Sequence, residues 1–235
     1  MKTEGNAQTN GSGASEPRRG RELELWLLGK TAGALRRVVN RLERRVLPEA
    51  TSAEDQWQRV VMNQAVDAHI ASLEPARLSA AEISGETHAG KGWKSYRSLH
   101  YPDFDLCAPV PDDLRFDVVI CEQVLEHVPD PWLAVRNLRR LCRPGGHVIV
   151  TSPFLIKVHE IPIWDMRDYW RFTPRGLRTL LHEAGLRVET IGQWGNRQCV
   201  TGNLRWWPAY RPWLSLDNGR DIPVQIWAFA RNPAR

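Results

Sequence analysis

The sequence is poor in cysteine: it has four among 235 residues, and none stands in a CxxC or other metal-ligand spacing. We therefore expect free thiols in a reducing compartment, and no metal site. No apolar run approaches the about 20 residues that a membrane-spanning helix needs, and no signal peptide precedes the first amphipathic segment. These absences predict a cytoplasmic protein without disulfides or membrane spans.

The sequence also lacks a strong charge imbalance. Its formal net charge is only +5, and much of the basic excess lies before residue 48. There is no lysine-rich stripe and no Asn/Asp-Pro-Pro-aromatic motif, so we expect no nucleic-acid partner. A hydrophobic content of 42% over this length supports one domain with a single core, plus appendages.

Composition divides the chain into three parts. Residues 1–20 are rich in Gly, Ser, Asn and Thr and are expected to be a disordered tail. Residues 21–75 form a predicted helical extension with two amphipathic helices, over Glu22–Leu47 and Ala53–Leu73. The first has arginines opposite its leucine and valine stripe, so it could lie on an anionic membrane surface, cap the domain or join a homodimer. Residues 76–235 are the predicted catalytic domain.

The run Phe116–Phe154 predicts a strand, a polar turn, a helix and a second strand. Val118–Ile120 and Val148–Val150 are short β-branched blocks, typical of strands covered on both faces. Asp130 and Pro131 supply the N-cap and the first-turn proline of the helix between them. A right-handed crossover makes the two strands parallel neighbours, as in a doubly wound α/β sheet.

Three runs in chain order carry a family resemblance: FDVVICEQVLEHV, LRRLCRPGGHVIVTSPF and FTPRGLRTLLHEAGLRV. They resemble the central and C-terminal half of class I S-adenosylmethionine-dependent methyltransferases, in the branch with a leucine-glutamate-histidine motif. The resemblance covers roughly residues 78–195. It implies a Rossmann-like, seven-stranded, mostly parallel sheet with an antiparallel last strand, S-adenosylmethionine as cofactor, and methyl transfer as the reaction. The alternative is a generic doubly wound α/β domain.

The first strand and its loop depart from the family pattern of an acid followed by alternating glycines. In ARLSAAEISGETHAGKGW, Glu82, Ser84 and Gly85 align with the acid and the first positions of close cofactor approach. This degenerate motif puts cofactor affinity in doubt. It motivates the alternative of a methyltransferase fold that serves as a non-catalytic binding or scaffold subunit.

The next segment is compact, with expected strands at Tyr96–Tyr101 and Phe104–Cys107. The resemblance implies acids after the second and third strands, near the ribose and the adenine; either acid could instead cap a turn. Polar residues after the strand at Val118–Ile120 lie at the edge where open α/β sheets bind ligands. Glu126 and His127 are interpreted as structural. The expected cofactor-binding residues of this region are Asp103, Asp105, Leu106, Glu122 and Gln123.

The segment KVHEIPIWDMRDYWRFTPRGL is too long for a minimal turn, and the resemblance places the acceptor beside it. His159 fits a general base for methylation of a hydroxyl group. Asp165 or Asp168 fits its orienting partner, although Asp168 could instead pair with Arg171. Tyr169 and Arg171 are expected to shape the acceptor pocket.

A tryptophan-rich loop separates the last two predicted strands, at Arg187–Ile191 and Val224–Ala230. Aromatic faces stack on sugar rings, so Trp206 and Trp207 are expected substrate-binding residues; packing of the loop onto the body is the alternative. The sequence thus predicts methyl transfer to a small molecule, with a sugar hydroxyl favoured.

Overall fold

A computed structural model describes residues 16–234, in two compact units that divide after Pro48. The first unit contains helix α1 (Glu16–Val46), which is rich in the strong helix formers leucine, arginine and glutamate. Of the predicted disordered tail, residues 1–15 lie outside the described residues, whereas residues 16–20 are helical. Within residues 16–234, no helix is both long enough and apolar enough to cross a membrane.

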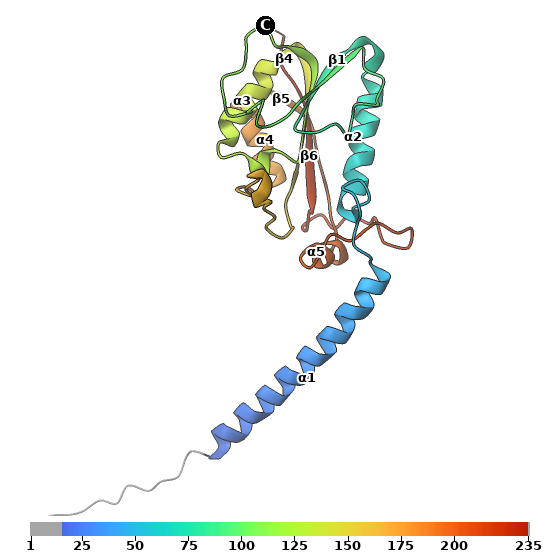
Figure 1. Ribbon diagram of the computed structural model, residues 1–235, viewed down its shortest axis with the longest axis vertical. Helices are drawn as coiled ribbons and strands as arrows, with labels where there is room; N and C mark the ends of the chain where they lie inside the picture. Colours follow the sequence, from blue (N-terminus) through green and yellow to red (C-terminus); the bar gives the residue numbers. More distant parts are fainter. Residues whose placement is uncertain (1–15, 235) are drawn as a thin grey trace, which may run out of the picture. The chain divides into compact units, whose positions relative to one another are not determined.

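The second unit is built on a six-stranded sheet in the order β2-β1-β3-β4-β6-β5 (Figure 1). Strands β1 to β4 are parallel, while β6 runs antiparallel to both of its neighbours. The predicted α/β class and the antiparallel last strand are confirmed. The strands are β1 (Ser79–Ile83), β2 (Ser95–Leu99), β3 (Phe116–Glu122), β4 (Cys142–Pro153), β5 (Arg187–Trp194) and β6 (Gln225–Arg231).

A seventh strand does not form among the described residues. The segment Phe104–Cys107, predicted to be a strand, consists of turns. Its backbone amides donate to residues nearby in the sequence. The Phe104 amide donates to the His100 carbonyl at 2.7 Å, and the Cys107 amide donates to the Asp105 carboxylate at 2.7 Å. Because these amides are already paired, they cannot join the edge of the sheet at β2.

Helices cover both faces of the sheet, with α3 and α4 on one side and α2 on the other (Figure 1). The predicted N-cap is confirmed, since the Asp130 side chain accepts from the Leu133 amide. Thr173 caps α4 in the same way through the Gly176 amide. The helices are α2 (Val60–Ser72), α3 (Pro131–Leu141), α4 (Pro174–Glu183) and α5 (Arg197–Asn203), with a short 3₁₀ turn, η1 (Trp57–Arg59), before α2.

Helix α2, grouped from the sequence with the N-terminal extension, belongs to the second unit. Its Met62, Val66 and Ile70 are at most 1% exposed and join a core cluster on one face of the sheet. Burial of each such side chain stabilises the fold by about 1.5–3 kcal/mol. The helix therefore fixes the position of η1 beside the ends of the strands.

The tryptophan-rich loop packs onto the segment that leads into η1. The Trp57 amide donates to the Pro208 carbonyl at 2.9 Å, and the Ala50 amide to the Trp207 carbonyl at 2.7 Å. The fully buried Trp57 ring also donates from Nε1 to the Ser215 carbonyl. Most of this loop therefore packs onto the body of the protein, which was the alternative to a role in substrate binding.

Candidate active site

A cavity of about 600 Å³ lies at the carboxyl ends of the parallel strands. Its walls include Ser84 after β1, His100 after β2 and Gln123 after β3. This is the edge at which open α/β sheets bind ligands. Four predicted cofactor residues line it: Ser84, Asp105, Leu106 and Gln123.

Glu82, also predicted to bind the cofactor, is 1% exposed and is not among the described residues that line this cavity. Its carboxylate accepts hydrogen bonds from the amides of Thr87 (3.1 Å) and His88 (2.9 Å) and from the Tyr96 hydroxyl (2.7 Å). A side chain at Gly85 would collide with the same carboxylate. Glu82 therefore organises the loop after β1, and Gly85 is required by that close approach.

Ser84 and Gln123 share an unusual backbone conformation, with φ of 52° and 55°. This left-handed region favours glycine, and residues held in it often cluster at functional sites. Ser84 thus adopts the backbone that a glycine of the family motif would adopt easily. The Gln123 side chain is fixed by donating to Thr151 Oγ1 at 3.0 Å and to Gln225 Oε1 at 2.8 Å.

Two further predicted cofactor residues lie elsewhere. Asp103 is exposed and does not line the cavity described above; His100 and Tyr101 do. The Glu122 side chain is only 5% exposed and is bonded to Arg59 at 3.2 Å and to His88 Nε2 at 3.0 Å. Burial lowers the pKa of His88, but the hydrogen bond and charge of Glu122 outweigh it, so the pKa is raised. Glu122 therefore ties η1 to the end of β3.

A second cavity, of about 450 Å³, lies beside the first. Residues of η1, the loop after β4 and the tryptophan-rich loop line it, among them Arg59, His159 and Trp207. Gln123 lines both cavities, so they are neighbours across one side chain.

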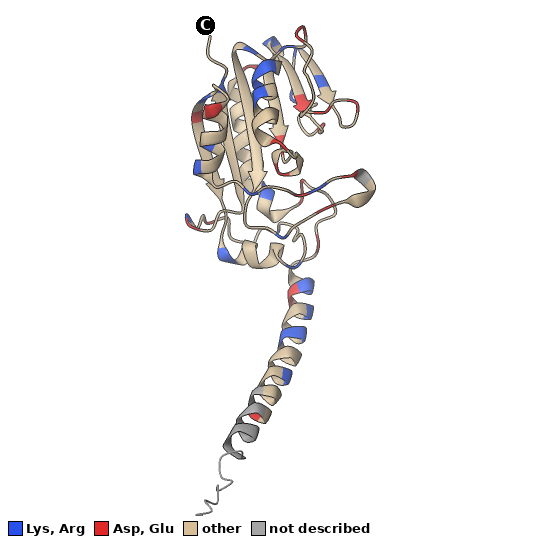
Figure 2. Ribbon diagram, turned by 90° about the vertical axis from the view of Figure 1, so that its left-hand side faces the viewer, with Lys and Arg blue, Asp and Glu red and all other residues tan. Residues whose placement is uncertain are grey.

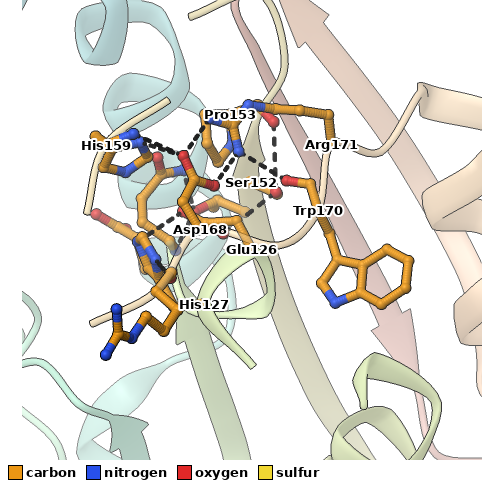
Figure 3. Close-up of polar contacts among 12 residues, drawn as sticks. Glu126, His127, Ser152, Pro153, His159, Asp168, Trp170 and Arg171 are labelled. Atoms are coloured by element: carbon orange, nitrogen blue, oxygen red, sulfur yellow. Dashed lines mark hydrogen bonds and ion pairs between the residues drawn. The ribbon is translucent and has the colours of Figure 1, made fainter. Parts of the chain in front are cut away.

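His159 lines the second cavity, and its ring lies against Asp168, which is not among the described residues that line this cavity (Figure 3). His159 Nδ1 lies 3.0 Å from Asp168 Oδ2, and the same oxygen accepts from the His159 amide at 2.8 Å. Arg171 holds the carboxylate with two further hydrogen bonds. From the sequence, Asp168 could either orient His159 or pair with Arg171. The structure shows both contacts at once.

The charge states suit proton removal near neutral pH. Burial lowers the pKa of His159, and the charge of Asp168 offsets only part of this effect, so the imidazole is neutral. Burial acts to raise the pKa of Asp168, but the hydrogen bonds from Arg171 and from the His159 amide outweigh it and keep the carboxylate ionised. A neutral imidazole beside a fixed carboxylate can accept a proton.

The other predicted residues of these loops differ in position. Asp165 is exposed and pairs with Arg167 at 3.2 Å; within the described residues it has no contact with His159. Tyr169 lines the first cavity instead of the second. Trp206 is only 6% exposed, because it packs into the body, whereas the Trp207 ring lies 5.5 Å from that of His159. Of the two tryptophans, Trp207 can face an acceptor.

Glu126 and His127, interpreted from the sequence as structural, are also functional candidates. Glu126 is fully buried; Ser152 donates to its Oε2 at 3.3 Å, and its Oε1 has no hydrogen-bond partner. Burial raises the pKa of Glu126 to about 8. The His127 ring lies 4.9 Å from that of His159. The sequence signal that could have identified this group is the Glu126-His127 pair after β3 together with His159 after the neighbouring strand β4.

Glu126, His127 and His159 could together hold a divalent cation. Each offers one ligand atom, and these atoms lie within 4.8 Å of one another. Imidazole and carboxylate ligands suit several transition metals. No metal was expected from the sequence, because its cysteines lack metal-ligand spacing and this group contains no cysteine.

The order of the strands, the antiparallel β6 and a cavity at the carboxyl ends of β1 to β3 define a class I methyltransferase architecture. The chain belongs to the methyltransferase-domain family, whose sequence model matches residues 22–191. The class I methyltransferase family recognised from the sequence, with S-adenosylmethionine as its cofactor, is confirmed; the leucine-glutamate-histidine branch stays a prediction.

Individual relatives match over shorter stretches. Ubiquinone biosynthesis O-methyltransferase of Alkalilimnicola ehrlichii is 37% identical over 100 residues, which cover 43% of this chain and 36% of that protein. The enzyme of the same name from Pseudomonas syringae pv. tomato is 44% identical over 102 residues, covering 37% and 42%. The matches thus span less than half the length of these curated relatives. Among solved structures, N-methyltransferase NodS from Bradyrhizobium japonicum, in complex with S-adenosyl-L-homocysteine, is 15% identical with a TM-score of 0.46, covering 77% of this chain and 94% of that chain.

Proposed function

We propose that this protein transfers a methyl group from S-adenosylmethionine to a hydroxyl oxygen of a small molecule. One observation carries the proposal: two neighbouring cavities share Gln123, and the second is lined by His159, whose Nδ1 lies 3.0 Å from Asp168. The first cavity fits the cofactor because apolar Ile83 and Leu106 lie in its wall with the acidic Asp105. The cofactor supplies an electrophilic methyl group on a sulfonium.

The residues of the chain supply alignment and proton removal. Asp168 Oδ2 lies 3.0 Å from His159 Nδ1 and accepts from the His159 amide, so the carboxylate lies beside the ring and Nε2 is left to take the proton of the acceptor hydroxyl. The new bond joins that oxygen to the methyl carbon as the carbon–sulfur bond breaks, and the proton passes to His159. Arg171 keeps Asp168 ionised and in place.

The acceptor class divides into two candidates. A sugar hydroxyl, favoured from the sequence, is supported by Trp207 in the wall of the second cavity. A phenolic hydroxyl is supported by the names of the relatives and by apolar Ile156 and Val158 in the same wall. Assays of sugars and dihydroxybenzoates with radiolabelled methyl donor distinguish them, because only one class should saturate the enzyme.

Blocking the first cavity tests the cofactor site. Ser84→Phe adds a ring to the cavity wall and should weaken binding of S-adenosylhomocysteine by about tenfold or more, as expected for a steric cost of 1–3 kcal/mol. Ser84→Ala adds no bulk and is the matched control. Calorimetry measures both affinities against the wild type. If the wild type binds no S-adenosylhomocysteine, the proposal fails and the scaffold alternative is supported.

Metal removal tests whether His159 acts as a base or as a cation ligand. Under the proposal, a chelator should leave the rate of methyl transfer unchanged, because His159 removes the proton without a metal. The proximity of Glu126, His127 and His159 favours the other role, in which His159 is a cation ligand. Loss of activity in chelator that zinc or manganese restores would make these residues ligands and overturn the base assignment.

A further inference from the structure

Helix α1 carries the entire net charge of the chain. Its sequence has nine Lys and Arg residues against four Glu, whereas positive and negative residues balance in the rest of the chain. The net charge of +5 therefore belongs to 31 residues. Figure 2 shows Lys and Arg recurring along this helix. None of the residues placed in the two cavities belongs to it.

The same helix has a continuous apolar stripe. Leu28, Leu35, Val39, Leu42 and Val46 are separated by seven, four, three and four residues, which places them on one face. They are 40–66% exposed. By contrast, α2, α3 and α4 bury the apolar faces that their sequences provide.

Charge decides which partner fits this stripe. Lys30, Arg37 and Arg41 lie on the face opposite the stripe, since each falls about half a helical turn away from it. Pairing with a second copy would bring together two helices of net charge +5. An anionic lipid surface instead offers opposite charge to the basic residues and an apolar interior to the stripe.

We propose that α1 lies in the surface of an anionic membrane, with its stripe at the acyl boundary and its basic residues toward the headgroups. Trp26 lies on the basic face, where the Lys30 ammonium is 3.8 Å from its ring centroid. The inference is independent of the proposed chemistry, because it uses no residue of either cavity.

Vesicle sedimentation of the full chain tests the inference. Vesicles of phosphatidylcholine with phosphatidylglycerol should pellet the protein, vesicles of phosphatidylcholine alone should not, and added salt should release it. Arg37→Glu/Arg41→Glu should weaken binding by about tenfold or more, since each basic residue near an anionic surface contributes about 1 kcal/mol. Arg175→Glu/Arg178→Glu changes net charge equally on exposed positions of α4 and should bind as the wild type does.

A second pair of variants tests the stripe. Leu42→Glu should also lose binding, whereas Leu204→Glu, at an exposed leucine of the second unit, should not. Calorimetry with S-adenosylhomocysteine reports separately on the cofactor site, so failure of the proposed function is distinguishable. Equal binding to both kinds of vesicle, binding to neither, or a dimer in sedimentation equilibrium that Leu42→Glu dissociates would each overturn the inference.

Discussion

His159→Ala is expected to lower kcat by about a hundredfold to ten-thousandfold, the usual contribution of a positioned general base. Its affinity for S-adenosylhomocysteine should stay near that of the wild type, because His159 lies in the wall of the second cavity. Rates measured with saturating acceptor, alongside calorimetry, separate the two effects. Loss of cofactor binding, or full retained activity, would show that His159 has no role in proton transfer.

The pH dependence of the rate gives an independent test of the same residue. Burial holds the pKa of His159 below its usual value, so kcat should fall only at pH values below about 6.5. Asp168→Asn removes a charge that raises this pKa, and should therefore move the fall in rate to still lower pH while reducing the maximal rate. An unchanged acidic limb in this variant would contradict the assignment of Asp168 as the orienting residue.

Glu126→Gln is expected to stabilise the protein at alkaline pH. Burial raises the pKa of Glu126 in the folded protein to about 8, whereas an unfolded chain titrates near its ordinary 4.5. Between these values the folded state binds the extra proton, so the stability of the wild type falls as pH rises through this window. A neutral glutamine of the same shape avoids that loss and still accepts from Ser152. The gain should be on the order of a few kcal/mol at high pH and vanish below the unfolded pKa.

Urea unfolding in the presence of chelator, at acidic and alkaline pH, measures this difference. Glu183→Gln, at an exposed position of α4, is the matched control and should show no such dependence on pH. A glutamine variant that is less stable than the wild type at high pH would show that the Glu126 carboxylate is ionised in the folded protein and stabilised by a nearby positive charge such as that of Arg59.

The fold was predictable where local signals and tertiary packing agree. The run Phe116–Phe154 formed the expected β3, α3 and β4, because β-branched blocks, an aspartate cap and a first-turn proline all favour these elements. The missing strand at Phe104–Cys107 shows the opposite case. Its length suited a short strand, but the Asp105 carboxylate accepts from the Cys107 amide and stabilises a turn.

The site was less predictable because its contacts join distant residues. A sequence pattern could place Asp165 and Asp168 on one loop, but not show that only Asp168 faces His159. Likewise the adjacent Trp206 and Trp207 look equivalent, although one is buried in the body and the other faces the second cavity. Glu82 matched the acid of the family motif in position, yet its carboxylate accepts hydrogen bonds from the backbone amides of the loop after β1.

Gln123 gives the two cavities a common side chain, held by Thr151 of β4 and Gln225 of β6. An occupant of either cavity that displaces this amide must break those hydrogen bonds, and a second occupant then finds them already broken. Binding of the two ligands should therefore be cooperative, with each raising the affinity for the other by the same factor. Gln123→Ala should abolish that mutual enhancement, so that cofactor affinity measured with and without a saturating acceptor becomes equal.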